Sequence, residues 1–339
     1  MNRILITGGM GFIGTNLARF LIEKKINILV LDKLTYAANL ESHSDLVRNK
    51  FYKFKNLDIC NENELTNVIK EYSPDKIIHL AAESHVDNSI NNPDTFIYTN
   101  IIGTYNLLKA SLEYFKELDN TKSKYFRFHH VSTDEVYGSL KENDEAFAEI
   151  NKYKPNSPYS ASKASSDHLV RAWNKTYKLP TIITNCSNNY GPFQHPEKLI
   201  PVIIKNAIEH KDIPVYGNGL QIRDWLHVSD HVEALYHVLI KGNIGETYNI
   251  GANNEIRNIE LINSICEYID QVEPSKKLNT YKNLIKHVED RKGHDVRYAI
   301  NTKKINNDLG WFAKINFNEG IKSTIKWYLE NKSWIKNFK

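Results

Sequence analysis

The feature that most constrains the fold is the glycine-rich segment TGGMGFIG near the N-terminus, which contains Gly8, Gly11 and Gly14. It directly follows a predicted strand at residues 3–7 and opens a predicted helix at residues 12–24. Glycine permits a tight turn and lets a pyrophosphate approach the backbone, while the helix N-terminus supplies N–H donors and a favourable dipole. The segment therefore predicts a dinucleotide-binding βαβ unit.

An acidic residue follows the next predicted strand, residues 27–31. Asp32 lies 18 positions after Gly14, where a carboxylate can accept hydrogen bonds from an adenosine ribose. It also repels a 2′-phosphate, so NAD is favoured over NADP. A glycine pattern alone would equally fit a turn that only lets a helix pack on a strand. The order strand, glycines, helix, strand and acid favours the cofactor site.

Short apolar runs alternate with helix-period segments in the first half of the chain. Strands are predicted at residues 3–7, 27–31, 51–57, 76–80, 126–131 and 181–185, and helices at 12–24, 62–71, 94–118 and 159–177. This alternation predicts an α/β fold with a Rossmann-type, doubly wound parallel sheet. Beyond the glycine and proline breakers near residue 190, helices are predicted at 198–210, 229–240, 258–268 and 319–330.

We therefore expect two parts with an approximate boundary. Residues 1–190 would form the NAD-binding part that carries the catalytic residues. Residues 191–339 would form a smaller α/β part that binds mainly the substrate and closes a cleft, with segments crossing between the two.

Composition excludes several classes of function. The net charge is +4 and the lysines are scattered, which argues against a nucleic-acid binder. The three cysteines fit no zinc or disulfide framework, and the 13 histidines form no metal-ligand motif, so we expect free thiols and no metal. No apolar stretch approaches the roughly 18 residues that span a membrane. No signal-peptide pattern opens the chain. We expect a cytoplasmic protein.

A tyrosine and a lysine share one face of the helix predicted at residues 159–177. Tyr159 and Lys163 are separated by four positions, and a nearby ammonium would lower the pKa of the phenol from near 10 towards neutrality. Such a tyrosine can take a proton from a substrate hydroxyl while hydride leaves the same carbon. Alone, this spacing also fits an ordinary surface helix, but after a dinucleotide cradle the catalytic interpretation is favoured.

The cradle with Tyr159 and Lys163 resembles the extended short-chain dehydrogenase/reductase family, whose members act on nucleotide sugars with a tightly held NAD. The resemblance covers nearly the whole chain. It implies that Tyr159 is the base and that Lys163 tunes it and anchors the nicotinamide ribose. It also implies a homodimer in which residues 94–118 and 159–177 form a four-helix bundle.

Two adjacent carboxylates, Asp134 and Glu135, follow the fifth predicted strand at the end where ligands bind. They fit a turn, but two carboxyls in different surroundings can also divide acid and base roles in removing water from a sugar. Thr133-Asp134-Glu135 in this place is similar to the nucleotide-sugar 4,6-dehydratases, whereas related 4-epimerases typically have small hydroxyl residues there.

Five further segments extend this resemblance to the members of the family that act on dTDP-glucose. They are AESHVD (residues 82–87), NNYGP (188–192), PEKLIP (196–201), RDW (223–225) and DRKGHDVRY (290–298). Asn88 departs from the arginine frequent in the family, but it is not one of the catalytic positions.

The resemblance implies conversion of dTDP-glucose to dTDP-4-keto-6-deoxyglucose by an internal redox cycle. Tyr159 would deprotonate the C4 hydroxyl, held by Thr133, as hydride passes to NAD. Glu135 would remove the C5 proton, Asp134 would protonate the departing C6 hydroxyl, and hydride would return to C6. Such a product feeds deoxysugar biosynthesis, for example that of rhamnose.

The diphosphate needs cations, and the best candidates are Arg223 and Arg291, because a guanidinium binds phosphate oxygens through two parallel hydrogen bonds. A single arginine also fits a surface ion pair, but the family pattern favours these two. Lys198 and His294 would assist. The other candidate substrate contacts are Ser84, His85, Asn188, Leu199, Pro214, Tyr216, which would stack on the pyrimidine, and Asn258.

The remaining candidate cofactor contacts are Phe12, Ile13, Lys33, Asp58, Ile59, Ala81, Ala82, Thr99 and Asn185. Asp58 fits a helix cap equally well, and the small residues Ala81 and Ala82 fit a simple turn. Two other functions remain open. One is a UDP-sugar 4-epimerase or a 4,6-dehydratase for a UDP-, CDP- or GDP-sugar, and the other is an NAD-binding regulatory protein.

Overall fold

The computed structural model describes residues 3–336 and contains a seven-stranded parallel sheet of order β10-β6-β5-β4-β1-β2-β3. This order confirms the predicted Rossmann-type fold. The strands are β1 (Arg3–Thr7), β2 (Asn27–Asp32), β3 (Tyr52–Asn56), β4 (Lys76–His79), β5 (Arg127–Thr133), β6 (Thr181–Cys186) and β10 (Thr247–Ile250).

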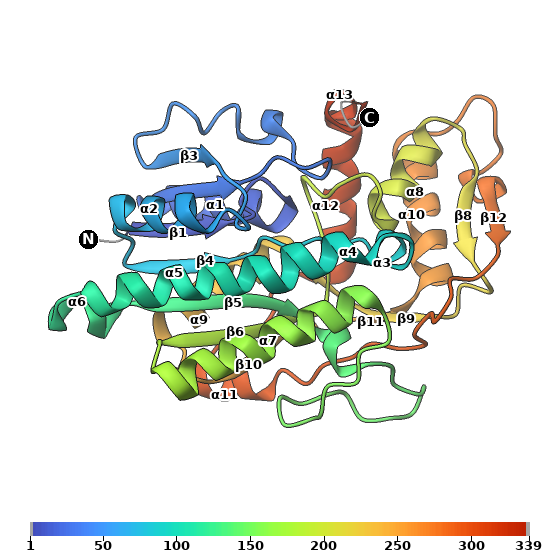
Figure 1. Ribbon diagram of the computed structural model, residues 1–339. Coiled ribbons are helices and arrows are strands. Elements are labelled where there is room, and N and C mark those ends of the chain that lie inside the picture. The colour runs from blue at the N-terminus through green and yellow to red at the C-terminus, as the bar shows by residue number, and fades with distance from the viewer. Residues whose placement is uncertain (1–2, 337–339) are drawn as a thin grey trace.

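Both faces of this sheet are buried, which explains why its strands are continuous apolar runs. Along β1, Ile4 and Ile6 face one core and Leu5 faces the other, and each is at most 1% exposed. The first core lies under α1 (Phe12–Glu23), α9 (Val228–Lys241) and α11 (Lys303–Leu309). The second lies under α2 (Glu62–Tyr72), α5 (Thr104–Glu117) and α7 (Pro158–Tyr177), of which α5 and α7 cross the front of the sheet in Figure 1.

The smaller part has its own core, built on the right side of Figure 1. Its strands pair as β11-β9-β7 and β12-β8. The elements are β7 (Asn188–Tyr190), β8 (Ile213–Tyr216), β9 (Ile222–His227), β11 (Glu255–Arg257), β12 (Ile285–Val288), α8 (Leu199–Ile208), α10 (Asn258–Val272), α12 (Phe317–Glu330) and α13 (Lys332–Lys336).

The segment predicted as one helix at residues 94–118 has a more complex structure. It comprises α4 (Pro93–Phe96), a π-helix (Ile97–Gly103) and α5, preceded by α3 (Val86–Asn91) and followed by α6 (Asn120–Tyr125). In the π-helix, Asn100 accepts a hydrogen bond from the Glu83 N–H and donates to the Ser162 hydroxyl. The widened turn thus places a buried amide between the end of β4 and helix α7.

Segments from the second half of the chain contribute to the Rossmann sheet. Strand β10 pairs with β6 as an edge strand, and α9 and α11 cover the first core. The division of the chain near residue 190 remains a prediction. Within residues 3–336, none of the helices combines the length and apolar character needed to cross a bilayer.

Candidate functional site

A cavity of about 600 Å³ lies at the carboxyl ends of the central strands, where the strand order of the sheet reverses between the paired strands β1 and β4. Both parts of the chain line it. Every site residue predicted from the sequence lines this cavity except Asn185. The fold therefore gathers residues that are up to 286 positions apart, from Gly8 to His294, into one site.

The three positions of the cradle require glycine for different structural reasons. Gly8 has φ +69°, and a Cβ there would lie 2.5 Å from the Ala81 nitrogen. At Gly14 a Cβ would lie 2.5 Å from the Gly8 carbonyl oxygen, so this glycine lets α1 pack on the turn. At Gly11 a Cβ would touch only the Gly8 oxygen, at 3.4 Å, and would otherwise project into open space. Gly11 also begins α1 without a side-chain cap, which leaves first-turn N–H groups for a ligand.

The acids at the ends of β2 and β3 frame the adenosine end of the cavity. Asp32 accepts hydrogen bonds from the Met10 N–H at 3.0 Å and the Leu34 N–H at 2.9 Å, and burial raises the pKa of its carboxyl. The Lys33 ammonium lies 3.8 Å from Asp58 and donates to the Thr99 hydroxyl. Asp58 does not cap α2, contrary to the alternative considered above.

Asn61 supplies that cap instead, by accepting from the Glu64 N–H. The carboxylate of Asp58 accepts from the Cys60 N–H and remains in the cavity lining.

The tyrosine–lysine pair lies on α7, whose N-terminus is fixed by a reciprocal capping box between Ser157 and Ser160. The Lys163 ammonium donates to the Val131 carbonyl oxygen at 2.9 Å. Burial and the neighbouring carboxylate of Glu135 raise the pKa of Tyr159 well above 10. Burial and the charges of Glu135 and Asp134 thus oppose the lowering of this pKa that is expected from the Lys163 ammonium.

The acid pair occupies the turn after β5, where its members have different surroundings. Asp134 is 2% exposed, and its pKa is raised well above the usual range by burial and by the charges of Glu135 and Asp224. Burial also raises the pKa of Glu135, but the cations of Arg223, Lys198 and Arg291 oppose this effect. The two carboxyls are thus differentiated, with Asp134 favoured as the protonated acid and Glu135 as the base.

Cations from the second part of the chain face this acid pair. Arg223 is held by the Ile222 and Asp295 carbonyl oxygens at 2.8 and 3.0 Å, over the Tyr298 ring. Arg291 makes a bidentate ion pair with Asp87 of α3, at 2.5 and 2.8 Å.

The other two candidate phosphate contacts, Lys198 and His294, also have partners within the protein. Lys198 donates to the Ser84 carbonyl oxygen at 2.9 Å. His294 lies 2.6 Å from Asp290, with Tyr216 beside it.

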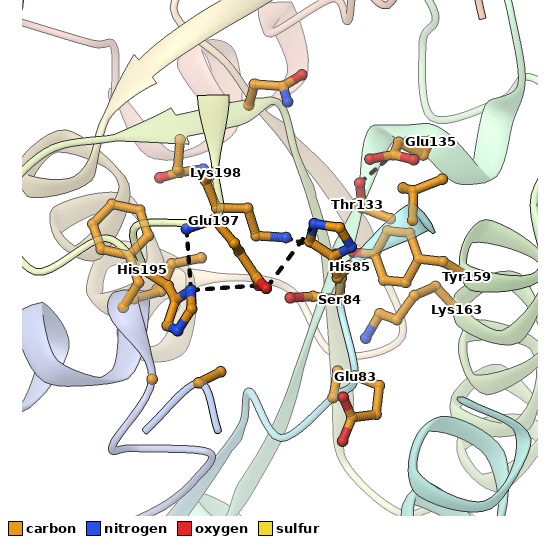
Figure 2. A pocket seen from close by; sticks show the side chains of 18 of the residues that line it. Glu83, Ser84, His85, Thr133, Glu135, Tyr159, Lys163, His195, Glu197 and Lys198 are labelled. Atoms are coloured by element: carbon orange, nitrogen blue, oxygen red, sulfur yellow. Dashed lines mark hydrogen bonds and ion pairs between the residues drawn. The ribbon is translucent and has the colours of Figure 1, made fainter. Parts of the chain in front are cut away.

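Sequence analysis missed several residues of the cavity. Figure 2 shows Thr133, Glu135, Tyr159 and Lys163 on one side, facing His195, Glu197 and Lys198 on the other. The Glu197 carboxylate lies 3.7 Å from His195 and 4.0 Å from His85. Asp87 and Glu197 both lie inside quoted family segments, and an acid next to a predicted substrate contact is the feature that could have identified them.

Asn185 lies behind the cavity wall rather than on it. Its side-chain amide donates to the Thr133 carbonyl oxygen at 3.1 Å and to the Asp167 carboxylate at 3.2 Å. Its predicted place beside the nicotinamide stays a prediction. Throughout residues 3–336, no cluster of three or more His, Cys, Asp or Glu side chains has the arrangement of a metal site.

Three comparisons with known proteins agree with this geometry. Residues 5–324 match a family model described as GDP-mannose 4,6 dehydratase. The chain is 54% identical, over 99% of its length and 96% of the relative, to a dTDP-glucose 4,6-dehydratase of Neisseria meningitidis serogroup B.

Solved structures superpose closely on the whole chain. A dTDP-glucose 4,6-dehydratase from Streptomyces venezuelae with NAD bound has a TM-score of 0.90 at 38% identity, covering 99% of this chain and all of its own. The enzyme of the same description from Bacillus anthracis, in complex with NAD, has a TM-score of 0.87 at 43% identity, with both chains fully covered.

Proposed function

The chain belongs to the family described as GDP-mannose 4,6 dehydratase, and from this premise we propose that it converts dTDP-glucose to dTDP-4-keto-6-deoxyglucose with bound NAD. The observation that carries the proposal is the differentiated pair Asp134 and Glu135, set beside Tyr159 in a cavity that begins at a dinucleotide cradle. A hydro-lyase needs such an acid and base together. A 4-epimerase, which loses no water, does not.

The residues of the cradle fit NAD. Gly11 leaves room for the pyrophosphate, Asp32 is placed for the ribose hydroxyls, and Lys163 lies near the reacting end. When bound, NAD would supply a reversible hydride acceptor and a positively charged nicotinamide ring. That charge would oppose the carboxylates that raise the pKa of Tyr159.

Tyr159 and Thr133 act on the C4 hydroxyl. The phenolate form of Tyr159 takes the hydroxyl proton and becomes the phenol, while the Thr133 hydroxyl holds the substrate oxygen in place. The Thr133 hydroxyl accepts a hydrogen bond from the Glu135 N–H and contacts an Asp134 oxygen, each at 3.3 Å. Thr133 therefore joins the site of C4 oxidation to the two carboxyls that remove water.

Glu135 and Asp134 expel water across C5 and C6. The 4-keto group acidifies the C5 hydrogen, and the Glu135 carboxylate removes it. Asp134, whose pKa burial raises, donates its proton to the C6 hydroxyl, which departs as water. Return of hydride to C6 and of a proton to C5 completes the cycle, so the enzyme needs no external reductant.

Arg223, Arg291 and Lys198 would bind the diphosphate, with Tyr216 and Asn258 near the nucleoside. Arg291 already holds the carboxylate of Asp87, which has the charge and the bidentate geometry of a phosphate group. A bound diphosphate would therefore compete with Asp87 for this guanidinium.

A homodimer through a four-helix bundle is the assembly that we propose. Its support is a row of exposed apolar side chains over the π-helix and the start of α5, namely Ile97, Tyr98, Ile102 and Tyr105, of which Tyr105 packs on Trp173 of α7. A monomer at micromolar concentration in light scattering would contradict this assembly. The cytoplasmic location remains a proposal as well.

The test is incubation of the purified protein with dTDP-glucose, UDP-glucose and GDP-mannose in parallel. We expect dTDP-glucose to lose one water by mass spectrometry and to give a 4-keto-6-deoxy sugar that absorbs near-ultraviolet light in alkali. Because one thymine methyl contributes about 1–3 kcal/mol, the preference over UDP-glucose should be about 5- to 150-fold. Stoichiometric NADH, or an isomer of unchanged mass, would refute the proposal.

A further inference from the structure

A buried carboxylate that the reaction does not use lies directly behind the tyrosine–lysine pair. Asp167 follows Lys163 by one helical turn and Tyr159 by two turns on the same face of α7. It is 0% exposed, whereas an unbalanced buried charge is expensive. A carboxylate buried at this position needs a group that offsets its charge.

Asp167 is held by hydrogen bonds but not by a formal cation among its direct partners. One carboxylate oxygen lies 3.2 Å from His130 Nε2. The other accepts from the Tyr153 hydroxyl at 3.0 Å and from the Asn185 amide at 3.2 Å. Burial lowers the pKa of His130 to about 4, so at neutral pH this imidazole is uncharged and does not neutralise the carboxylate. The hydrogen bonds fix the carboxylate without neutralising it.

The opposite charge is Lys163. Its ammonium is 4% exposed and donates to one carbonyl oxygen, and burial lowers its pKa. Asp167 is the carboxylate whose charge opposes this lowering. The pKa of Asp167 is in turn lowered, against the effect of burial, first by His130 and then by the charge of Lys163. The other titratable or charged groups around this face of α7 are His79 of β4, His130 of β5, Cys186 of β6, Asp134, Glu135 and Tyr137 of the turn after β5, Tyr153 and Arg171.

We infer that Asp167 is a positioning residue: it is the buried counter-charge that keeps the Lys163 ammonium charged and in place beside Tyr159. This inference rests on the proposed function, because it assigns Lys163 the role of anchoring the cofactor ribose. Asn185 extends the arrangement, since its amide joins the Asp167 carboxylate to the Thr133 carbonyl oxygen. The charge on α7 and the acid–base turn after β5 therefore share one buried network.

The experiment is titration of nucleotide-free protein with NADH, followed by fluorescence, at pH 6 and pH 8.5. Asp167→Asn keeps the shape of the side chain but removes its charge, which should lower the Lys163 pKa by about 1–3 units. We expect NADH binding about tenfold weaker than in the wild type at pH 8.5, where Lys163 would be neutral, and within about threefold at pH 6. Equal weakening at both pH values, or none, would overturn the inference.

A matched control is Asp230→Asn. Asp230 is also buried, at 3% exposure, but it lies on α9 and accepts hydrogen bonds from the Lys314 and Ile315 N–H groups. We expect this variant to lower the Tm without changing the pH dependence of NADH binding. A change in its pH dependence like that of Asp167→Asn would show that the effect belongs to any buried carboxylate, which also refutes the inference.

A second measurement covers the case in which Asp167→Asn does not fold. Lys163→Met leaves Asp167 as an unbalanced buried charge, so in that background Asp167→Asn should raise the Tm instead of lowering it. Equal Tm losses in both backgrounds would overturn the inference. Neither the NADH titration nor the Tm measurement uses the sugar. A wild type that fails to dehydrate dTDP-glucose would therefore refute the proposed function without changing the outcome of these two measurements.

Discussion

Replacement of Gly11 by alanine separates cofactor binding from folding at the cradle. Gly11 has φ −77° and ψ 177°, an extended conformation that alanine adopts freely. The added Cβ would meet one atom, the Gly8 carbonyl oxygen, at 3.4 Å. Gly14→Ala is the matched comparison, because its Cβ would lie 2.5 Å from both the Gly8 oxygen and the Gly9 Cα.

The expected magnitudes differ between the two variants. For Gly11→Ala, the free energy of unfolding of the nucleotide-free protein should change by less than about 1 kcal/mol, since no protein atom has to move. The methyl group would instead occupy the approach of the pyrophosphate, at a cost of about 1–3 kcal/mol, which corresponds to a Kd about 5- to 150-fold higher. For Gly14→Ala, overpacking of backbone against backbone should cost about 1–3 kcal/mol of folding stability itself.

The assay combines thermal unfolding of the nucleotide-free protein with NADH titration, for the wild type and both variants. Gly11→Ala should keep the wild-type Tm and lose affinity, whereas Gly14→Ala should lose both. Wild-type affinity in Gly11→Ala would refute the assignment of this turn to the pyrophosphate. A Tm loss in Gly11→Ala equal to that of Gly14→Ala would show that both glycines serve folding alone.

Two further predictions concern acids and histidines. Glu135→Gln should slow dehydration about 10²- to 10⁴-fold while NADH still forms at 340 nm; the exposed Glu142→Gln is its control, and normal water loss would contradict the role. Burial lowers the pKa of six histidines to about 3 or 4, namely His43, His85, His129, His130, His195 and His231. Their stabilising contribution is complete above pH 6.5 and lost as pH falls towards 4, by up to about 1.4 kcal/mol per pH unit each, so a Tm equal at pH 7 and 5 would contradict it.

The cofactor half of the site could be predicted because its information is local. Strand, glycine turn and helix occupy residues 3–24, and Asp32 follows within one βαβ step, so chain connectivity alone brings these groups together. Tyr159 and Lys163 share a face by helical spacing. The location of Thr133, Asp134 and Glu135 followed from the rule that parallel strands present their carboxyl ends at one edge.

Short strands and unusual turns could not be predicted in this way. Strands β7 and β11 have three residues each, too few for a hydrophobic period to appear, and β9 finds its partners more than 30 positions away along the chain. The π-helix at Ile97–Gly103 continues the apolar spacing of its neighbours, so the sequence pattern did not distinguish it from α-helix.

By itself, the sequence determined the sheet and predicted the cradle and the acid–base residues. The sheet and the cradle follow from order and spacing along the chain, and the roles of Asp134 and Glu135 from the resemblance to a known family. Tertiary structure alone decided their electrostatics. The partner of Arg291 is Asp87, 204 positions away, and the high pKa of Tyr159 comes from burial beside Glu135. Burial and the distances between charges exist only after distant segments pack together, and these set the protonation state of each group.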